Sequence, residues 1–185
     1  MSELSTNITE NTTPKTSKKI VVAAKPKRTI DDVSLNERVA IDNLYGWTIG
    51  FRASESERDI LIAPYVKNFK QLTVAEVDAQ VKLGNIAFCG TDSYGSHAAF
   101  RIIDPVIREY IFGEDINPVQ LTEEKVKELF AIDNKKSFEK ALADLVVTDS
   151  EKKMIVILAE KIGIDDVVSF KLSAIEKLSG IKFDH

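Results

Sequence analysis

The residues best able to do chemistry gather in one stretch, FCGTDSYGSHAAFRI, from Phe88 to Ile102. It contains the single cysteine, Cys89, one of the two histidines, His97, and an aspartate, Asp92. A thiol, an imidazole and a carboxylate that orients the imidazole are the parts of a cysteine nucleophile with its base. The same stretch also holds glycines and serines, which are typical of tight turns. It therefore predicts either an active site or a shaped turn.

Three features favour the turn. Cys89 follows the apolar residues IAF, where a thiol is usually an inert small hydrophobe. No helix N-terminus or basic cluster follows it to lower its pKa. No serine of the chain lies in a Gly-x-Ser-x-Gly motif. We therefore expect no catalytic residue and interpret the protein as non-enzymatic.

Metal and cofactor sites are not expected either. The two histidines, His97 and His185, and the single cysteine make no spaced ligand cluster. The pair Asp165 and Asp166 precedes a helical pattern and more simply complements the helix dipole. No phosphate-binding Gly-x-x-x-x-Gly-Lys pattern occurs.

Elements before this stretch alternate between strand and helix patterns. Residues 38–51 read as strand with an interruption at NLYG, and residues 58–64 read as a second strand. A helix is expected to begin at a capping box of Thr73 and Glu76 and to end near Gly84.

The stretch itself reads as a hairpin. IAFCG and HAAFRIID are predicted to be strands, with GTDSYGS as the turn between them. A short helix is then expected from Pro105, with Gly113 beyond its end.

The last third of the chain is helical in pattern. Short amphipathic segments follow one another with polar links, and one begins at a capping box of Thr148 and Glu151. The fold class is therefore α+β: a β-rich, barrel- or sandwich-like domain over 29–113 with a short inserted helix, then a small helical bundle over 118–185. No segment has the roughly 20 apolar residues of a membrane span.

Residues 1–28 are predicted to be a disordered basic arm. They hold six of the 25 basic residues and two of the 29 acidic ones, so the arm carries +4 and the remaining chain −8. The β-branched run IVVAA within the arm suits a strand that pairs with the edge of a neighbour's sheet, although a solvated tail without a role is the alternative. The residues expected to bind partners are Lys18, Lys19, Ile20, Val21, Val22, Lys25, Lys27 and Arg28 in the arm, with Asp92, Tyr94 and His97 in the turn.

A nucleic-acid-binding or regulatory protein is the alternative function. The arm could touch phosphates nonspecifically, and the short helices could form a DNA-binding bundle. A base-stacking face would need aromatics on a basic sheet, but the β-rich region carries more acids than bases. We therefore expect its aromatics to be core. They are Tyr45, Trp47, Phe51, Phe88 and Phe100.

Residues 40–113 resemble small structural proteins of tailed bacteriophages. The shared pattern has an aromatic strand ending in F-R, a D-I-x-I-P strand, and a helix running into G-N-x-x-F-x-G-T-D-x-x-G-x-H-A. The sequence departs from it at DPVIRE, where proline replaces an acid, and the helical region lies outside it. The matching positions are Trp47, Phe51, Arg52, Asp59, Ile60, Ile62, Gly84, Asn85, Phe88, Gly90, Thr91, Asp92, Gly95, His97, Ala98 and Asp104.

This resemblance implies a non-catalytic virion protein of the head or head–tail region, made in the host cytoplasm. Its partners would be other virion proteins, such as capsid, portal or tail subunits, in a homo- or hetero-oligomer. The turn would be fixed by Asp92 and His97 or would meet a neighbouring subunit there. Deletion of residues 1–28 is expected to leave the fold intact and to weaken incorporation into particles.

Overall fold

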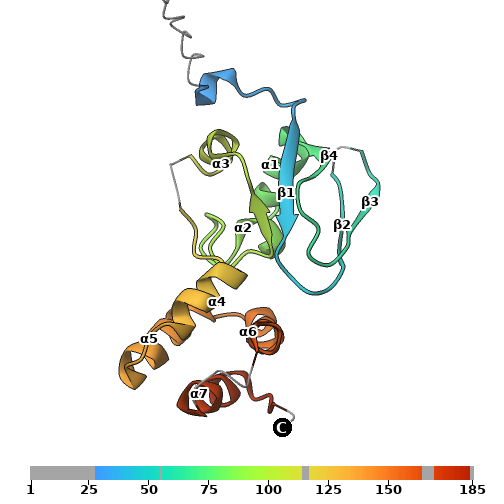
Figure 1. The fold of residues 1–185 in the computed structure, drawn as a ribbon. Helices are drawn as coiled ribbons and strands as arrows, with labels where there is room; N and C mark the ends of the chain where they lie inside the picture. Colours follow the sequence, from blue (N-terminus) through green and yellow to red (C-terminus); the bar gives the residue numbers. More distant parts are fainter. Residues whose placement is uncertain (1–27, 55, 114–116, 164–168, 184–185) are drawn as a thin grey trace, which may run out of the picture.

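The structure, a computed structural model, describes residues 28–54, 56–113, 117–163 and 169–183. Two small antiparallel sheets with short helices come first, and four helices follow. The four helices lie together at one end of the β-rich region, while the described chain starts near the other end (Figure 1). The α+β fold class expected from the sequence is confirmed.

The first sheet has the strand order β4-β1-β5. Its strands are β1 (Arg38–Asn43), β4 (Phe69–Thr73) and β5 (Phe100–Ile102). The register between β1 and β4 shifts between Val39 and Ile41, as in a β-bulge. β4 was not expected, because its sequence, FKQLT, shows little alternation of apolar and polar residues. In the structure only Leu72 of this strand is buried.

The second sheet pairs β2 (Ile49–Arg52) with β3 (Asp59–Ile62). The chain leaves β1 for this sheet at Asn43, which is fully buried. The Asn43 amide donates to the carbonyls of Trp47, Ile62 and Ala63, and its oxygen accepts from the Tyr45 N–H. The interruption expected within residues 38–51 is therefore a corner between two sheets, and the Asn43 side chain bridges it.

Two short helices follow β4. α1 (Val74–Lys82) begins at the expected capping box of Thr73 and Glu76. The prediction of a strand at IAFCG is wrong, because these residues form helix α2 (Ile86–Cys89). Asn85 caps this helix by accepting from the Ala87 N–H at 3.1 Å. The polar loop after it therefore joins a helix to a strand and is not a β-hairpin.

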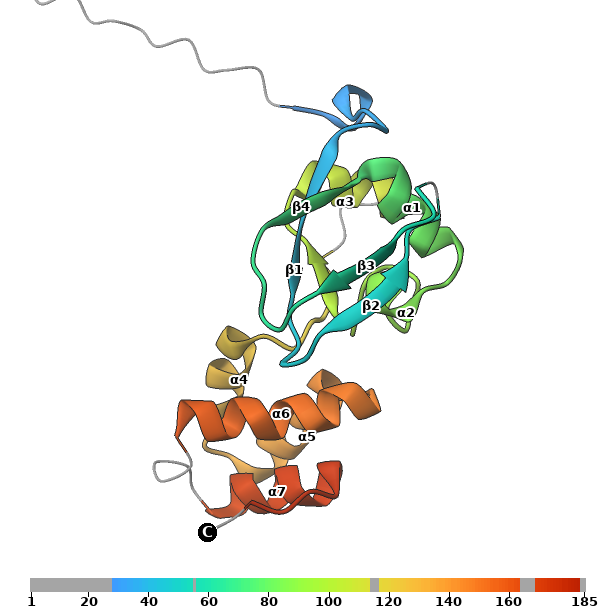
Figure 2. The same cartoon turned by 90° about the vertical axis from the view of Figure 1, so that its right-hand side faces the viewer.

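The β-rich region ends with α3 (Pro105–Phe112), as predicted. The Asp104 side chain caps its first turn, and Gly113 ends it in the left-handed conformation. At the opposite boundary a short 3-10 helix, η1 (Ile30–Asp32), precedes β1 and contacts α3. Both boundaries lie at the end of the fold away from the helical region (Figure 2).

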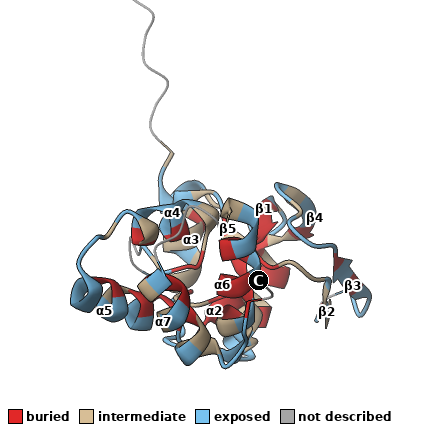
Figure 3. Ribbon diagram, turned by 60° about the horizontal axis from the view of Figure 1, so that its bottom comes forward, coloured by how far each residue is buried: buried red, intermediate tan, exposed pale blue. Residues whose placement is uncertain are grey.

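The helical region consists of α4 (Glu123–Phe130), α5 (Lys135–Leu145), α6 (Asp149–Ile162) and α7 (Ser169–Ser179). α6 contacts both α4 and α7, and α5 contacts both as well. Each helix turns its buried residues inward and leaves its other face exposed (Figure 3). The predicted capping box of Thr148 and Glu151 starts α6.

The buried apolar side chains form two clusters. One lies within the β-rich region and centres on Phe88 and Phe100, whose rings are 4.7 Å apart. The other joins the helical region to Leu44, Tyr45 and Ala99 of the β-rich region. The prediction that the aromatic residues belong to the core is confirmed for Tyr45, Phe88 and Phe100, while Trp47 and Phe51 are partly buried against it.

Candidate functional site

The loop between α2 and β5 is built around the carboxylate of Asp92. Its Oδ1 accepts from the backbone N–H of Tyr94 at 2.8 Å and from that of Ser96 at 3.1 Å. Partial burial alone would raise the pKa of Asp92, but hydrogen bonds from Ser96 and Tyr94 outweigh it and leave the pKa below its ordinary value. Asp92 thus closes the turn by bonding its own backbone.

The backbone of this loop doubles back on itself. The Thr91 N–H donates to the Ser96 carbonyl at 2.9 Å, and the Gly95 N–H donates to the Cys89 carbonyl at 2.8 Å. Gly90 has a φ of 67° and a ψ of −156°, a conformation almost restricted to glycine. A Cβ at Gly90 would lie 1.9 Å from the Ser96 carbonyl oxygen. The glycine of the G-T-D motif is therefore required by the close approach of two backbone segments.

His97 joins this loop to the helical region. Its Nδ1 lies 2.9 Å from Oε1 of Glu151, whose side chain is only 1% exposed. The other oxygen of Glu151 accepts from the N–H groups of Val147 and Thr148, both at 2.9 Å, and from the Thr148 hydroxyl. The carboxylate that starts α6 therefore also holds the loop.

Tyr45 lies beside this contact. Burial, and secondarily the charge of Glu151, raises the pKa of Tyr45 to about 12. An ionised phenolate there would be buried and would face a carboxylate, so the folded state favours the neutral form of Tyr45.

This shift predicts a loss of stability in alkali. The pKa of Tyr45 is 10.0 in the unfolded chain and about 12 in the folded chain. Its contribution to the free energy of unfolding is therefore complete below pH 10 and is lost as the pH rises from 10 to 12. We expect the free energy of unfolding to fall by about 2 kcal/mol more in the native sequence than in Tyr45→Phe over that range. Urea unfolding at stepped pH measures this. The exposed Tyr94→Phe is the matched control and should follow the native profile, and equal slopes for the native chain and Tyr45→Phe would contradict the assignment.

Cys89 is placed as a core residue. The thiol is buried, contacts its neighbouring Gly90 carbonyl at 3.6 Å, and has its pKa raised, mainly by burial. Burial thus disfavours the thiolate that a nucleophile needs. The imidazole of His97 bonds Glu151, and among the described residues no hydrogen bond connects it with the thiol.

The residues expected to bind partners fall into three groups. Tyr94 is exposed on the loop, whereas Asp92 and His97 are engaged within the chain. Arg28 ion-pairs with Glu37 at 2.5 Å and with Asp104 at 2.8 Å, so it lies against the folded part. The other arm residues lie outside the described residues. They are Lys18, Lys19, Ile20, Val21, Val22, Lys25 and Lys27.

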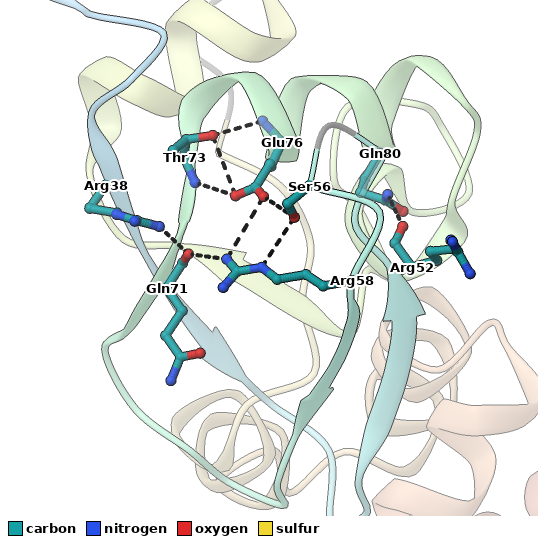
Figure 4. A network of polar contacts seen from close by, with 8 residues as sticks. All are labelled: Arg38, Arg52, Ser56, Arg58, Gln71, Thr73, Glu76 and Gln80. Carbon is teal, nitrogen blue, oxygen red and sulfur yellow. Dashed lines mark hydrogen bonds and ion pairs between the residues drawn. The ribbon is translucent and has the colours of Figure 1, made fainter.

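A second polar network links the two sheets (Figure 4). The buried carboxylate of Glu76 accepts from the Ser56 hydroxyl at 2.8 Å and lies 3.8 Å from the guanidinium of Arg58. Burial would raise the pKa of Glu76, but bonds from Thr73 and Ser56 and the charge of Arg58 leave it lowered.

Arg58 connects the second sheet to β4. It directly precedes β3, and its guanidinium also donates to the Gln71 carbonyl of β4 at 2.8 Å. Arg38 of β1 donates to the same carbonyl. β3 and β4 are therefore held together by side chains and not by a ladder of backbone hydrogen bonds. The same side chains cover this part of β4 with charge.

No family model, curated protein or solved structure matches this chain. Across the described ranges, no three His, Cys, Asp or Glu side chains are grouped so as to hold a metal ion. No helix among these residues has the length and apolar character needed to cross a membrane.

Two structural contacts could not be predicted from the sequence. The capping role of Glu151 is visible in the sequence, because Thr148 stands three residues before it, but its bond to His97 spans 54 positions. Arg58 gave no signal at all, since an arginine before a strand is common on surfaces. Only the fold brings these partners together.

Proposed function

We propose that the protein is a non-enzymatic structural or assembly component of a virus particle, of the kind found in the head or head–tail region of tailed bacteriophages. It binds neighbouring subunits through its basic arm and its β-rich region. The proposal rests first on the resemblance over residues 40–113.

The observation that carries the proposal is how the motif residues are used. Asn85 caps α2, Gly90 permits the close backbone approach, Asp92 closes the turn and His97 bonds Glu151. Each of these residues shapes the loop or fixes it to the helical region. A motif made of such residues preserves a shape, and this is what a subunit that must fit its neighbours requires.

Charge supports the same function. The arm carries +4 and the rest of the chain −8, so the arm of one subunit is attracted to the body of another. Each such contact is weak, but many copies in a particle act together. An acidic body also opposes adsorption to packaged nucleic acid.

Peptide mass spectrometry with copy-number estimation tests the assignment, on gradient-purified, nuclease-treated particles from the source culture. We expect copies in a fixed ratio to the major shell protein, in a multiple set by the symmetry of the shell, portal or tail. A protein abundant in the lysate but missing from the particles would contradict the proposal. Salt-sensitive retention on duplex DNA would then support the nucleic-acid-binding alternative.

Removal of the arm is expected to reduce incorporation. Because Arg28 pairs with Glu37 and Asp104, the truncation should remove residues 1–27 and leave these ion pairs in place. We expect about tenfold fewer copies per particle, with an unchanged circular dichroism spectrum, because a multivalent contact is lost while the core is untouched. Normal incorporation of the truncated chain would rule out a role for the arm.

A further inference from the structure

The outer edge of β2 carries backbone groups that the second sheet does not use. The Ala53 N–H donates to the Arg58 carbonyl, in the same register that pairs Gly50 with Leu61. Opposed residues in an antiparallel sheet alternate between hydrogen-bonded and non-hydrogen-bonded pairs. Because Ala53 and Arg58 are hydrogen-bonded, the pair three positions away, Gly50 with Leu61, is non-hydrogen-bonded. The N–H and C=O groups of Gly50, like those of Arg52, therefore point away from β3.

A contact from that side supports this geometry. Nε2 of Gln80, in α1, donates to the Arg52 carbonyl at 2.8 Å (Figure 4). Thr48 and Gly50 are exposed, and no backbone group in the described part of the chain bonds Gly50 from the outer side. An open strand edge thus runs from Thr48 to the N–H of Arg52.

An apolar hollow of about 180 Å³ lies beside the start of this edge. Ile49 of β2 and Trp47, two residues before the strand, line it from one side, and Ile86 and Ala87 line it from α2. Ile86 is 59% exposed, a large value for an isoleucine beside a core. Because alternate residues of a strand share a face, every second side chain of an added strand would extend this apolar surface.

The arm contains a segment that fits this edge. IVVAA, residues 20–24, has the five residues needed to lie along Thr48–Arg52 and is rich in β-branched side chains. Lysines flank it at Lys19 and Lys25.

Acidic groups stand near both ends of the edge. Glu57, in the loop after β2, has its side chain 81% exposed and lies 3.8 Å from the guanidinium of Arg52. Asp149, which is 91% exposed and pairs with Lys152 at 2.8 Å, stands between Thr148 and Ser150, which line the hollow. A strand laid along β2 in either direction would therefore bring its flanking lysines toward carboxylates that already pair with Arg52 and Lys152.

We propose that residues 20–24 of a second copy of this chain add to the outer edge of β2 as a strand. This inference deepens the proposed function, on which it rests, by naming where the arm binds. Only three residues separate Ala24 from Arg28, a span of at most about 14 Å. The described chain starts at the end of the fold away from the helical region (Figure 2). Arg28, two residues before η1, is ion-paired there with Asp104, whereas the hollow is lined by Thr148 and Ser150 at the start of α6. The arm is thus placed to reach a neighbour.

Residue-resolved amide hydrogen exchange of the full-length protein tests the pairing. We expect exchange at Gly50 and Arg52 to slow by about tenfold or more as protein concentration rises, because pairing buries their N–H groups. Asp59 and Leu61, whose N–H groups face the opposite edge of the same sheet, are internal controls and should be unaffected. In Val22→Lys the slowing should vanish, and in Val22→Ile it should persist.

Three outcomes would overturn the inference. Exchange at Gly50 that stays as fast as at Leu61 at every concentration would show that the edge is not used. Slowing that does not depend on concentration would assign the edge to the chain's own arm. Slowing that survives Val22→Lys would exclude the arm as occupant. If the protein is present in particles and Gly50 stays unprotected, the proposed function stands and only this inference fails, while the reverse result removes the virion role alone.

Discussion

A Gly90→Ala variant is expected to lose about 4 kcal/mol of the free energy of unfolding. Two costs combine at this position. The backbone angles of Gly90 are strained for any residue with a Cβ, and that Cβ would lie 1.9 Å from the Ser96 carbonyl oxygen. Since the obstacle is backbone, the loop must open to admit a methyl group. Such opening breaks the Thr91–Ser96 hydrogen bond and shifts His97 from Glu151.

Gly84→Ala is the matched control, because Gly84 also has a positive φ, 72°, but a Cβ at this position would meet no atom within 4 Å. It should cost only about 1 kcal/mol. Urea unfolding followed by circular dichroism gives both values. Equal losses in the two variants would mean that the close approach at Ser96 contributes nothing.

Glu151→Ala is the second large effect, with an expected loss of about 3–5 kcal/mol. The carboxylate is buried and accepts from two backbone N–H groups and the Thr148 hydroxyl, and it bonds the ring of His97. Removing it leaves these partly buried donors without their acceptor, which costs more than the bonds themselves contributed.

Fluorescence of Trp47, the single tryptophan, can be followed together with helical circular dichroism in this variant. Trp47 packs beside the cluster that joins both regions, so separate transitions would indicate that the joint is weakened. The control is Glu128→Ala, whose carboxylate is 65% exposed and pairs with Lys125, and whose cost should stay below about 0.5 kcal/mol. A loss of less than about 1 kcal/mol in Glu151→Ala would contradict the role given to its buried bonds.

Local features of this fold could be predicted because their causes are local. Thr73 with Glu76, and Thr148 with Glu151, are capping boxes whose partners are three residues apart, and both start helices as expected. Asp92 closing its own turn is of the same kind. Each of these contacts is set by neighbours in the chain, so the sequence pattern contains the whole cause.

The misassigned and missed elements have non-local causes. IAFCG has a strand-like composition, but Asn85 and the packing of Phe88 against Phe100 make it a helix. β4 exists because β1 offers it a ladder, not because its own residues alternate. The bond between His97 and Glu151 likewise depends on where the helical region sits.

The shared cluster of Leu44, Tyr45 and Ala99 with the helices has a consequence for synthesis. A ribosome completes the β-rich region first, so these side chains stay uncovered until α6 and α7 have emerged. A chain truncated after α3 would permanently expose the apolar patch that the helical region covers in the full-length protein. Such fragments bind chaperones and tend to aggregate. A defect in the last third of the chain is thus expected to expose apolar side chains of the first part.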